Sequence, residues 1–207
     1  MTKKHSSHKL NISLQQKNCM PNLYIISGCN GAGKTTASFT ILPEMLQCKE
    51  FVNADEIAKG LSPFQPDKVA IEAGRIMLKR IQELIDSNSD FAFETTLATR
   101  SYINTIKKAQ TKGYFVTLIY FWLNTPHLAL ERVKKRVLMG GHDIPEDIIH
   151  RRYKNGLSNL INLYVPNCDF WMIIDNSKPP FSIIAEGNKT ENIIISDLNI
   201  YNQITYL

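Results

Sequence analysis

Residues 28–35, GCNGAGKT, have the residue types and spacing of a phosphate-binding loop. They match the pattern G-x-x-x-x-G-K-[ST], in which glycines let successive backbone N–H groups point into one concavity. A helix expected to begin at Gly33 adds its positive N-terminal end to this concavity. Lys34 is expected to reach the β- and γ-phosphates, and Thr35 to offer its hydroxyl to Mg²⁺. The stretch therefore predicts a site for a nucleoside triphosphate.

We expect ATP to be the nucleotide and Mg²⁺ to accompany it. The side chains and backbone groups expected to contact the nucleotide all belong to the loop and the first turn of the helix after it. They are Gly28, Asn30, Gly31, Ala32, Gly33, Lys34, Thr35 and Thr36.

Strands and helices alternate around this loop. Residues 23–27 predict a strand buried on both faces, and residues 33–46 predict the helix that follows it. Further strands are expected over residues 51–54, 91–93, 114–123 and 170–174, and helices over 66–85, 101–112, 125–139 and 145–164. Residues 181–185 and 192–195 resemble a terminal β-hairpin. The expected fold is α/β, of the P-loop NTPase or kinase type: a mostly parallel sheet flanked by helices, with a small helical lid and a C-terminal β-hairpin.

Acidic residues follow three of the expected strands, at the edge where parallel sheets place their chemistry. Asp55 follows the strand over 51–54, which we expect beside the phosphate loop; it is suited either to take the proton of an acceptor hydroxyl or to cap the next helix. Glu94 is expected to hold an Mg²⁺-bound water or the acceptor. Asp175 resembles a Walker B acid, but the loop over residues 176–180 favours a turn or a position near the nucleotide base.

Arginines flank a glycine break in the second half of the chain. Arg132 and Arg136 share one helix face before Gly140 and Gly141, while residues 151–152 are both arginine and lie on the helix beyond. This arrangement predicts a lid over about residues 136–152 that closes over the triphosphate. The alternative is that these side chains form surface pairs along their own helices.

Composition favours one cytoplasmic domain over residues 21–207. With 207 residues, 43% hydrophobic and 21% charged, the chain has the composition of an ordinary soluble domain, without a membrane span or a secretory signal. Its four cysteines lack metal or disulfide spacing, as in proteins of a reducing compartment. Residues 1–20 carry four lysines and no acid, so they are expected to form a basic, poorly ordered tail. The remaining chain has 20 basic and 19 acidic residues, which disfavours nucleic acid as a partner.

Four ordered blocks resemble the zeta-toxin family of P-loop kinases, and most closely its compact bacterial branch of predicted ATPases. They are GCNGAGKTT from residue 28, NADEIA at 53–58, FETTLATR at 93–100 and RVLMGGHDIPEDIIHRRY at 136–153. The resemblance implies that Asp55 is the catalytic base and that Glu94 contacts the substrate, in addition to the metal role expected for it. It also implies that Arg136 and Arg152 are the lid arginines, with Arg132 and Arg151 left open as alternatives.

The resemblance also implies a small-molecule acceptor with a hydroxyl, of the nucleotide-sugar kind such as UDP-N-acetylglucosamine, and an antitoxin protein as partner. Family members commonly show E-G-T-x-R, whereas here the glycine is absent and the arginine comes two residues later. The alternative is a regulatory ATPase that acts through a protein partner. On the kinase interpretation, the residues expected to bind the acceptor are Asp55, Glu94, Thr95 and Arg100.

Overall fold

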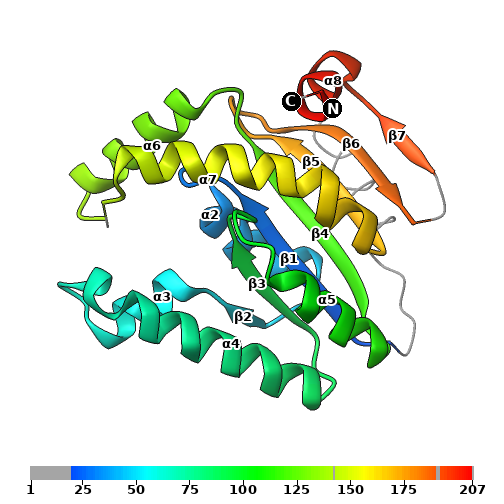
Figure 1. Cartoon of the computed structure of the whole chain (residues 1–207), viewed down its shortest axis with the longest axis horizontal. Coiled ribbons are helices and arrows are strands. Elements are labelled where there is room, and N and C mark those ends of the chain that lie inside the picture. Colours follow the sequence, from blue (N-terminus) through cyan, green and yellow to red (C-terminus); the bar gives the residue numbers. More distant parts are fainter. Residues whose placement is uncertain (1–19, 142, 190–191, 207) are drawn as a thin grey trace.

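The computed structural model describes residues 20–141, 143–189 and 192–206, and its strands form one seven-stranded sheet in the order β2-β3-β1-β4-β5-β6-β7 (Figure 1). The first five strands in this order run parallel, and β6 and β7 continue the sheet antiparallel. The strands are β1 Asn22–Gly28, β2 Glu50–Val52, β3 Phe91–Thr95, β4 Phe115–Trp122, β5 Phe170–Asp175, β6 Ser182–Asn188 and β7 Ile193–Ile195.

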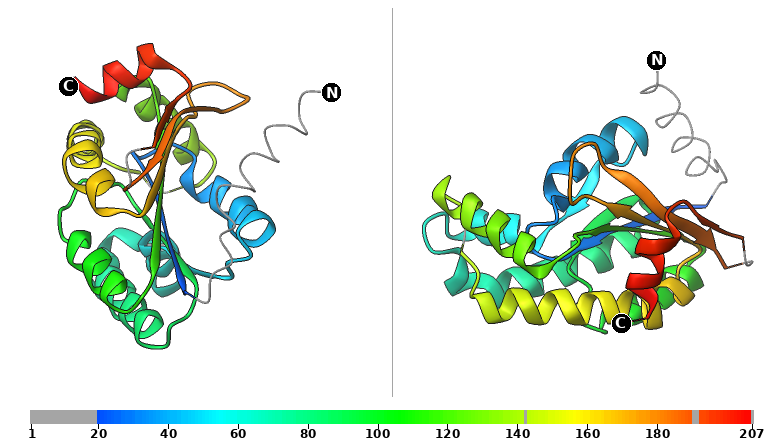
Figure 2. Two further views of the ribbon diagram at one scale, coloured as in Figure 1. Left: turned by 90° about the vertical axis from the view of Figure 1, so that its right-hand side faces the viewer. Right: turned by 90° about the horizontal axis from the view of Figure 1, so that it is seen from above.

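Helices cover both faces of the sheet, which Figure 2 shows nearly edge-on in its left-hand view. The longer ones are α2 Lys34–Thr40, α3 Ala54–Leu61, α4 Ala70–Asp86, α5 Tyr102–Thr111, α6 Pro126–Leu138, α7 Glu146–Asn159 and α8 Leu198–Thr205. Shorter turns continue or precede some of them: Ile41–Met45 and Leu160–Tyr164 are π-helical, and Pro66–Val69 and Val165–Asn167 are 3₁₀-helical. Within the described ranges, no helix is long and apolar enough to cross a membrane.

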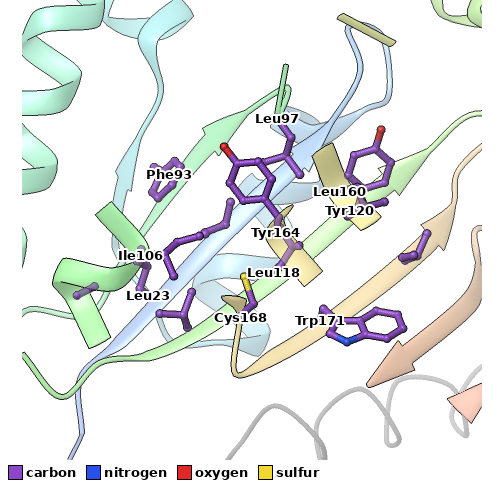
Figure 3. Close-up of a cluster of buried hydrophobic side chains, with 14 of the residues drawn as sticks. Leu23, Phe93, Leu97, Ile106, Leu118, Tyr120, Leu160, Tyr164, Cys168 and Trp171 are labelled. Carbon is purple, nitrogen blue, oxygen red and sulfur yellow. The ribbon is translucent and has the colours of Figure 1, made fainter. Parts of the chain in front are cut away.

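The two faces of the sheet have separate hydrophobic cores. On one face Leu23 and Ile25 of β1 pack with side chains from α4, α5 and the end of α7, and Figure 3 shows the centre of this cluster around Tyr164. On the other face Tyr24 and Ile26 pack with α2 and α6. Because β1 is buried on both faces, its residues are nearly all apolar, as expected for a central parallel strand.

The expected fold is confirmed: the sheet is mostly parallel, helices flank it and a C-terminal hairpin ends it. One expectation about strand order is wrong. The strand before Asp55 does not lie beside β1, because β3 is hydrogen-bonded between β2 and β1. Glu94, which is opposite Ile26 of β1, is therefore on the strand that adjoins the phosphate loop.

Several element boundaries also differ from expectation. Strand β2 ends at Val52, and Ala54 already belongs to α3. Strand β6 continues through residues 186–188, which were expected to form the hairpin turn. Helix α8 was not expected; it begins after Asp197, whose side chain accepts a hydrogen bond from the Ile200 backbone N–H. The basic tail expected over residues 1–20 lies outside the described residues, apart from Met20.

Candidate active site

The phosphate-binding loop lies where β1 ends and α2 begins. Gly31 and Gly33 have φ of 75° and 83°, a backbone region in which most other residues are strained. A side chain at position 33 would also meet the Asn176 amide, since a Cβ there would lie 2.7 Å from Nδ2. The same Nδ2 donates a hydrogen bond to the Ala32 carbonyl at 2.8 Å, so the loop after β5 holds the phosphate-binding loop in place.

Lys34 and Thr35 at the start of α2 form one polar group with Glu94 of β3, in which Lys34 is buried and the other two residues are partly buried. The Thr35 hydroxyl donates to Glu94 Oε2 at 2.8 Å, and Lys34 Nζ lies 3.5 Å from Glu94 Oε1. Lys34 also donates to the Cys29 carbonyl at 3.0 Å. Burial raises the pKa of the Cys29 thiol to about 11, although the Lys34 charge opposes the shift, so this thiol stays protonated near neutral pH.

Asn53 links Asp55 to the polar group of Lys34, Thr35 and Glu94. The sequence analysis did not identify Asn53 as a site residue. Its side-chain oxygen accepts from the backbone N–H groups of Asp55 and Glu56, at 2.8 and 3.3 Å, and so caps α3. Its amide nitrogen donates to Glu94 Oε2 at 2.9 Å. The idea that Asp55 caps this helix is therefore wrong. The detectable signal is an asparagine followed three residues later by glutamate, which is typical of a helix start.

Replacing Asn53 by alanine is expected to lower the free energy of unfolding by about 1–2 kcal/mol, because it removes a cap and one hydrogen bond to a buried carboxylate. Urea denaturation measures this change. Ser101→Ala is the matched control: Ser101 occupies the cap position of α5 but forms no cap hydrogen bond, so we expect a change below about 0.5 kcal/mol. Equal effects of the two substitutions would contradict the role assigned to Asn53.

The arginines near the glycine break take different positions. Arg152 is half-buried and its Nη1 donates to Asn30 Oδ1 at 3.3 Å, whereas Arg151 is exposed. Burial lowers the pKa of Arg152 and the charge of Asp55 opposes this shift. Arg132 donates to the Ser177 carbonyl at 3.0 Å. Of the two neighbouring arginines on α7, Arg151 and Arg152, it is therefore Arg152 that contacts the phosphate-binding loop.

A cavity of about 270 Å³ opens beside Thr35, between α3, the start of α4 and the end of α6. Asp55 and Arg136, which the sequence analysis predicted to be catalytic, both line this cavity. Thr35, which was expected to bind the metal, lines it as well. The lining residues are Thr35, Asp55, Glu56, Ala58, Lys59, Pro66, Asp67, Ala70, Arg136 and Gly141.

Other residues expected at the site are not among those that line this cavity. Thr95 accepts a hydrogen bond from the Leu97 backbone N–H, and Arg100 and Thr36 are exposed. Asp175 Oδ1 accepts from the Ser177 backbone N–H at 2.8 Å, which is a local turn and agrees with the turn favoured by its flanking sequence. The acceptor role of Thr95 and Arg100 therefore stays a prediction.

A phosphate-binding loop after the first strand, with a carboxylate on the adjoining strand and a second acid across a cavity, defines a P-loop NTPase fold of the kinase type. The chain belongs to the zeta-toxin family, because the family model described as Zeta toxin matches residues 7–176. It is thus a P-loop phosphotransferase that binds a nucleotide.

A relative from Haemophilus influenzae, described as an uncharacterized protein, is 36% identical over 127 residues, which are 61% of this chain and 88% of the relative. Two solved structures share the fold at low identity. One is the AvrRxo1-ORF1:AvrRxo1-ORF2 complex with sulphate ions, with a TM-score of 0.74 and 18% identity over 98% of this chain and 69% of the matched chain. The other comes from the PezAT toxin–antitoxin system of Streptococcus pneumoniae, with a TM-score of 0.66 and 17% identity over 98% of this chain and 86% of that chain.

Proposed function

We propose that the protein transfers the γ-phosphate of Mg·ATP to a hydroxyl of a small-molecule acceptor, with Asp55 as the general base. The observation that carries this proposal is that Asp55 and Thr35 line the same cavity. An acceptor in that cavity would lie between the base and the phosphate-binding loop. Family membership supports the reaction class, and nucleotide sugars are the acceptors that the resemblance implies.

The residues around Thr35 fit a magnesium ion. Mg²⁺ prefers hard oxygen ligands and is commonly held by one or two protein oxygens together with phosphates and water. The Thr35 hydroxyl and a Glu94 carboxylate oxygen, 2.8 Å apart, provide such oxygens at the start of α2. Thr35 and Glu94 would hold the ion, which supplies charge neutralisation to the phosphates when it is bound.

The proposed transfer needs one proton acceptor and several cations. Asp55 takes the proton of the acceptor hydroxyl while that oxygen forms its bond to the γ-phosphorus. The bond between the γ-phosphorus and the β,γ-bridging oxygen breaks, and ADP leaves. Lys34, Arg136 and Arg152 stabilise the negative charge on the transferred group and the leaving phosphate.

A protein partner is the second part of this proposal. The PezAT structure comes from a toxin–antitoxin system, and this supports an antitoxin as a partner of the present chain. A cytoplasmic location fits a kinase that uses ATP and whose described cysteines, Cys29, Cys48 and Cys168, are buried free thiols.

A regulatory ATPase is the second candidate function. The observation that favours it is the terminal strand β7, whose three isoleucines are 40–59% exposed along an edge of the sheet. Such an edge can pair with a strand of another protein.

An acceptor screen separates these two functions. Purified protein is incubated with Mg²⁺, γ-labelled ATP and pools of hydroxyl-bearing metabolites, and products are identified by mass spectrometry. The kinase proposal predicts a labelled metabolite that requires both Mg²⁺ and Lys34. Hydrolysis of ATP that a partner stimulates, with no phosphorylated metabolite, would contradict it and support the regulatory ATPase.

A further inference from the structure

We infer that Asn159 and Tyr164 are positioning residues for the acceptor. They hold the loop after β3, residues 96–100, against the helix that also carries Arg152. We call this segment the acceptor loop, because it contains Arg100, which is predicted to bind the acceptor. This inference rests on the proposed function and adds that α7 sets the position of the acceptor relative to the triphosphate.

One face of α7 contacts both the phosphate-binding loop and the acceptor loop. Arg152, Gly156 and Asn159 are spaced i, i+4 and i+7, so they lie one above another along the helix. Arg152 Nη1 donates to Asn30 Oδ1 of the phosphate-binding loop at 3.3 Å. One turn later Gly156 lies against the acceptor loop, since a Cβ at position 156 would be 2.4 Å from the Thr96 carbonyl oxygen. The two loops are therefore held by the same rigid element.

Two side chains beyond Gly156 donate hydrogen bonds to carbonyl groups of the acceptor loop. Asn159 Nδ2 donates to the Leu97 carbonyl at 2.8 Å, and the Tyr164 hydroxyl donates to the Thr99 carbonyl at 2.6 Å. Asn159 is only 6% exposed, so a loss of this bond leaves a buried polar group in an unfavourable position. These bonds attach the loop at two points to the end of α7 and to the π-helical turn that continues it.

The backbone of the acceptor loop has a conformation that depends on its surroundings. Leu97 has φ of 56°, in the left-handed region that residues with a side chain rarely adopt. Its side chain is fully buried in the same hydrophobic cluster as Leu160 and Tyr164 (Figure 3). Such a conformation is unfavourable and persists where neighbouring contacts impose it. Removal of the hydrogen bonds from α7 should therefore let the loop move.

The acceptor loop begins close to the proposed site of transfer. It comes directly after β3, on which the Glu94 carboxylate accepts a hydrogen bond from the Thr35 hydroxyl. Burial lowers the pKa of Arg152 and the charge of Asp55 opposes this shift, so the Arg152 guanidinium is within electrostatic reach of the proposed base. An acceptor between Asp55 and the phosphate-binding loop would thus lie beside α7. Because small displacements of reacting groups lower rates strongly, the attachment of the loop to α7 matters for transfer.

The first test measures the order of the acceptor loop without any acceptor. Asn159→Ala removes the amide that donates to Leu97. Asn162→Ala is the matched control, because Asn162 Nδ2 donates to the Ser158 carbonyl of its own helix at 2.9 Å. We expect N159A to speed hydrogen exchange of the backbone amides of residues 97–101 by about tenfold or more, and N162A to leave it unchanged. If N159A does not fold, Tyr164→Phe takes its place in this comparison.

The second test separates a positioning role from a purely structural one. Tyr164→Phe deletes the hydroxyl that contacts Thr99, and Tyr114→Phe is the matched control, because the Tyr114 hydroxyl donates to the Leu84 carbonyl at 2.8 Å. The probe acceptor is UDP-N-acetylglucosamine, supplied with Mg·ATP. We expect Y164F to raise KM for this acceptor by about fivefold or more, with Kd for Mg·ATP within about twofold of the wild type. Y114F should lower the melting temperature by a similar amount and leave this KM unchanged.

The outcomes distinguish this inference from the proposed function. Unchanged hydrogen exchange of the acceptor loop in the N159A variant, or equal KM values for Y164F and Y114F, would overturn the inference and leave the kinase proposal intact. Absence of transfer from Mg·ATP to UDP-N-acetylglucosamine by the wild-type protein would count against the proposed nucleotide-sugar acceptor. The hydrogen-exchange comparison would then still decide whether α7 holds the loop.

Discussion

Asp55→Asn is expected to lower the rate of phosphate transfer by about 10²–10⁴-fold, which corresponds to about 3–5 kcal/mol of lost transition-state stabilisation. Asparagine has the same shape but cannot take a proton from the acceptor hydroxyl. The Asp55 backbone N–H is held by Asn53, so the replaced side chain should keep its position at the start of α3. Single-turnover transfer gives the rate, and calorimetry should show nearly unchanged affinity for Mg·ATP.

Glu56→Gln is the matched control for this substitution. Glu56 is the next residue, lines the same cavity and forms an ion pair with Lys59, but the proposal gives it no role in proton transfer. We expect its effect on the transfer rate to stay below about tenfold. If the Asp55 variant transferred phosphate at the wild-type rate, the general base would be another group.

Lys34→Ala is expected to lower transfer by at least about 10³-fold and to weaken Mg·ATP binding, because it removes the cation that we propose contacts the β- and γ-phosphates. The Lys34 side chain is only 7% exposed and lies 3.5 Å from Glu94, so the variant also leaves a buried carboxylate without this cation. Loss of one partner of a buried ion pair costs several kcal/mol in typical cases. Thermal unfolding must therefore accompany the kinetic measurement.

Two further variants keep this prediction testable. The double variant K34A/E94Q removes both charges of the pair, so we expect its melting temperature to recover towards that of the wild type without recovery of transfer. Lys79→Ala removes a surface lysine that is 80% exposed, and it should change neither ATP affinity nor transfer. A folded Lys34→Ala protein with wild-type transfer would contradict the role of Lys34.

The sequence predicts the phosphate-binding loop well because all of its chemistry is local. The glycines, Lys34 and Thr35 lie within eight residues, and their conformation depends on their own backbone preferences. Strand order is not local in this sense. Nothing in residues 51–54 or 91–93 indicates which strand adjoins β1. In the structure β3 adjoins β1, so Glu94, and not Asp55, contacts the loop directly.

Whether a helix cap forms is likewise not predicted by residue type alone. Thr125 has an extended backbone with φ of −146°, and its side chain accepts from the Leu128 N–H as expected of a cap. Ser101 has a helical φ of −62°, so its hydroxyl pairs with Thr99 and makes no cap hydrogen bond. Residue type predicts that a cap is available, but the backbone of the preceding loop decides whether it forms.

A crystal structure with Mg²⁺ and a non-hydrolysable ATP analogue tests the central claim most directly. We expect the β- and γ-phosphates on the backbone amides of residues 31–35 and on Lys34, the magnesium ion on Thr35 with Glu94 beside it, and the terminal phosphate facing Asp55 across the cavity. A nucleotide bound elsewhere on the molecule, or a terminal phosphate that faces away from the Asp55 cavity, would contradict the proposed transfer.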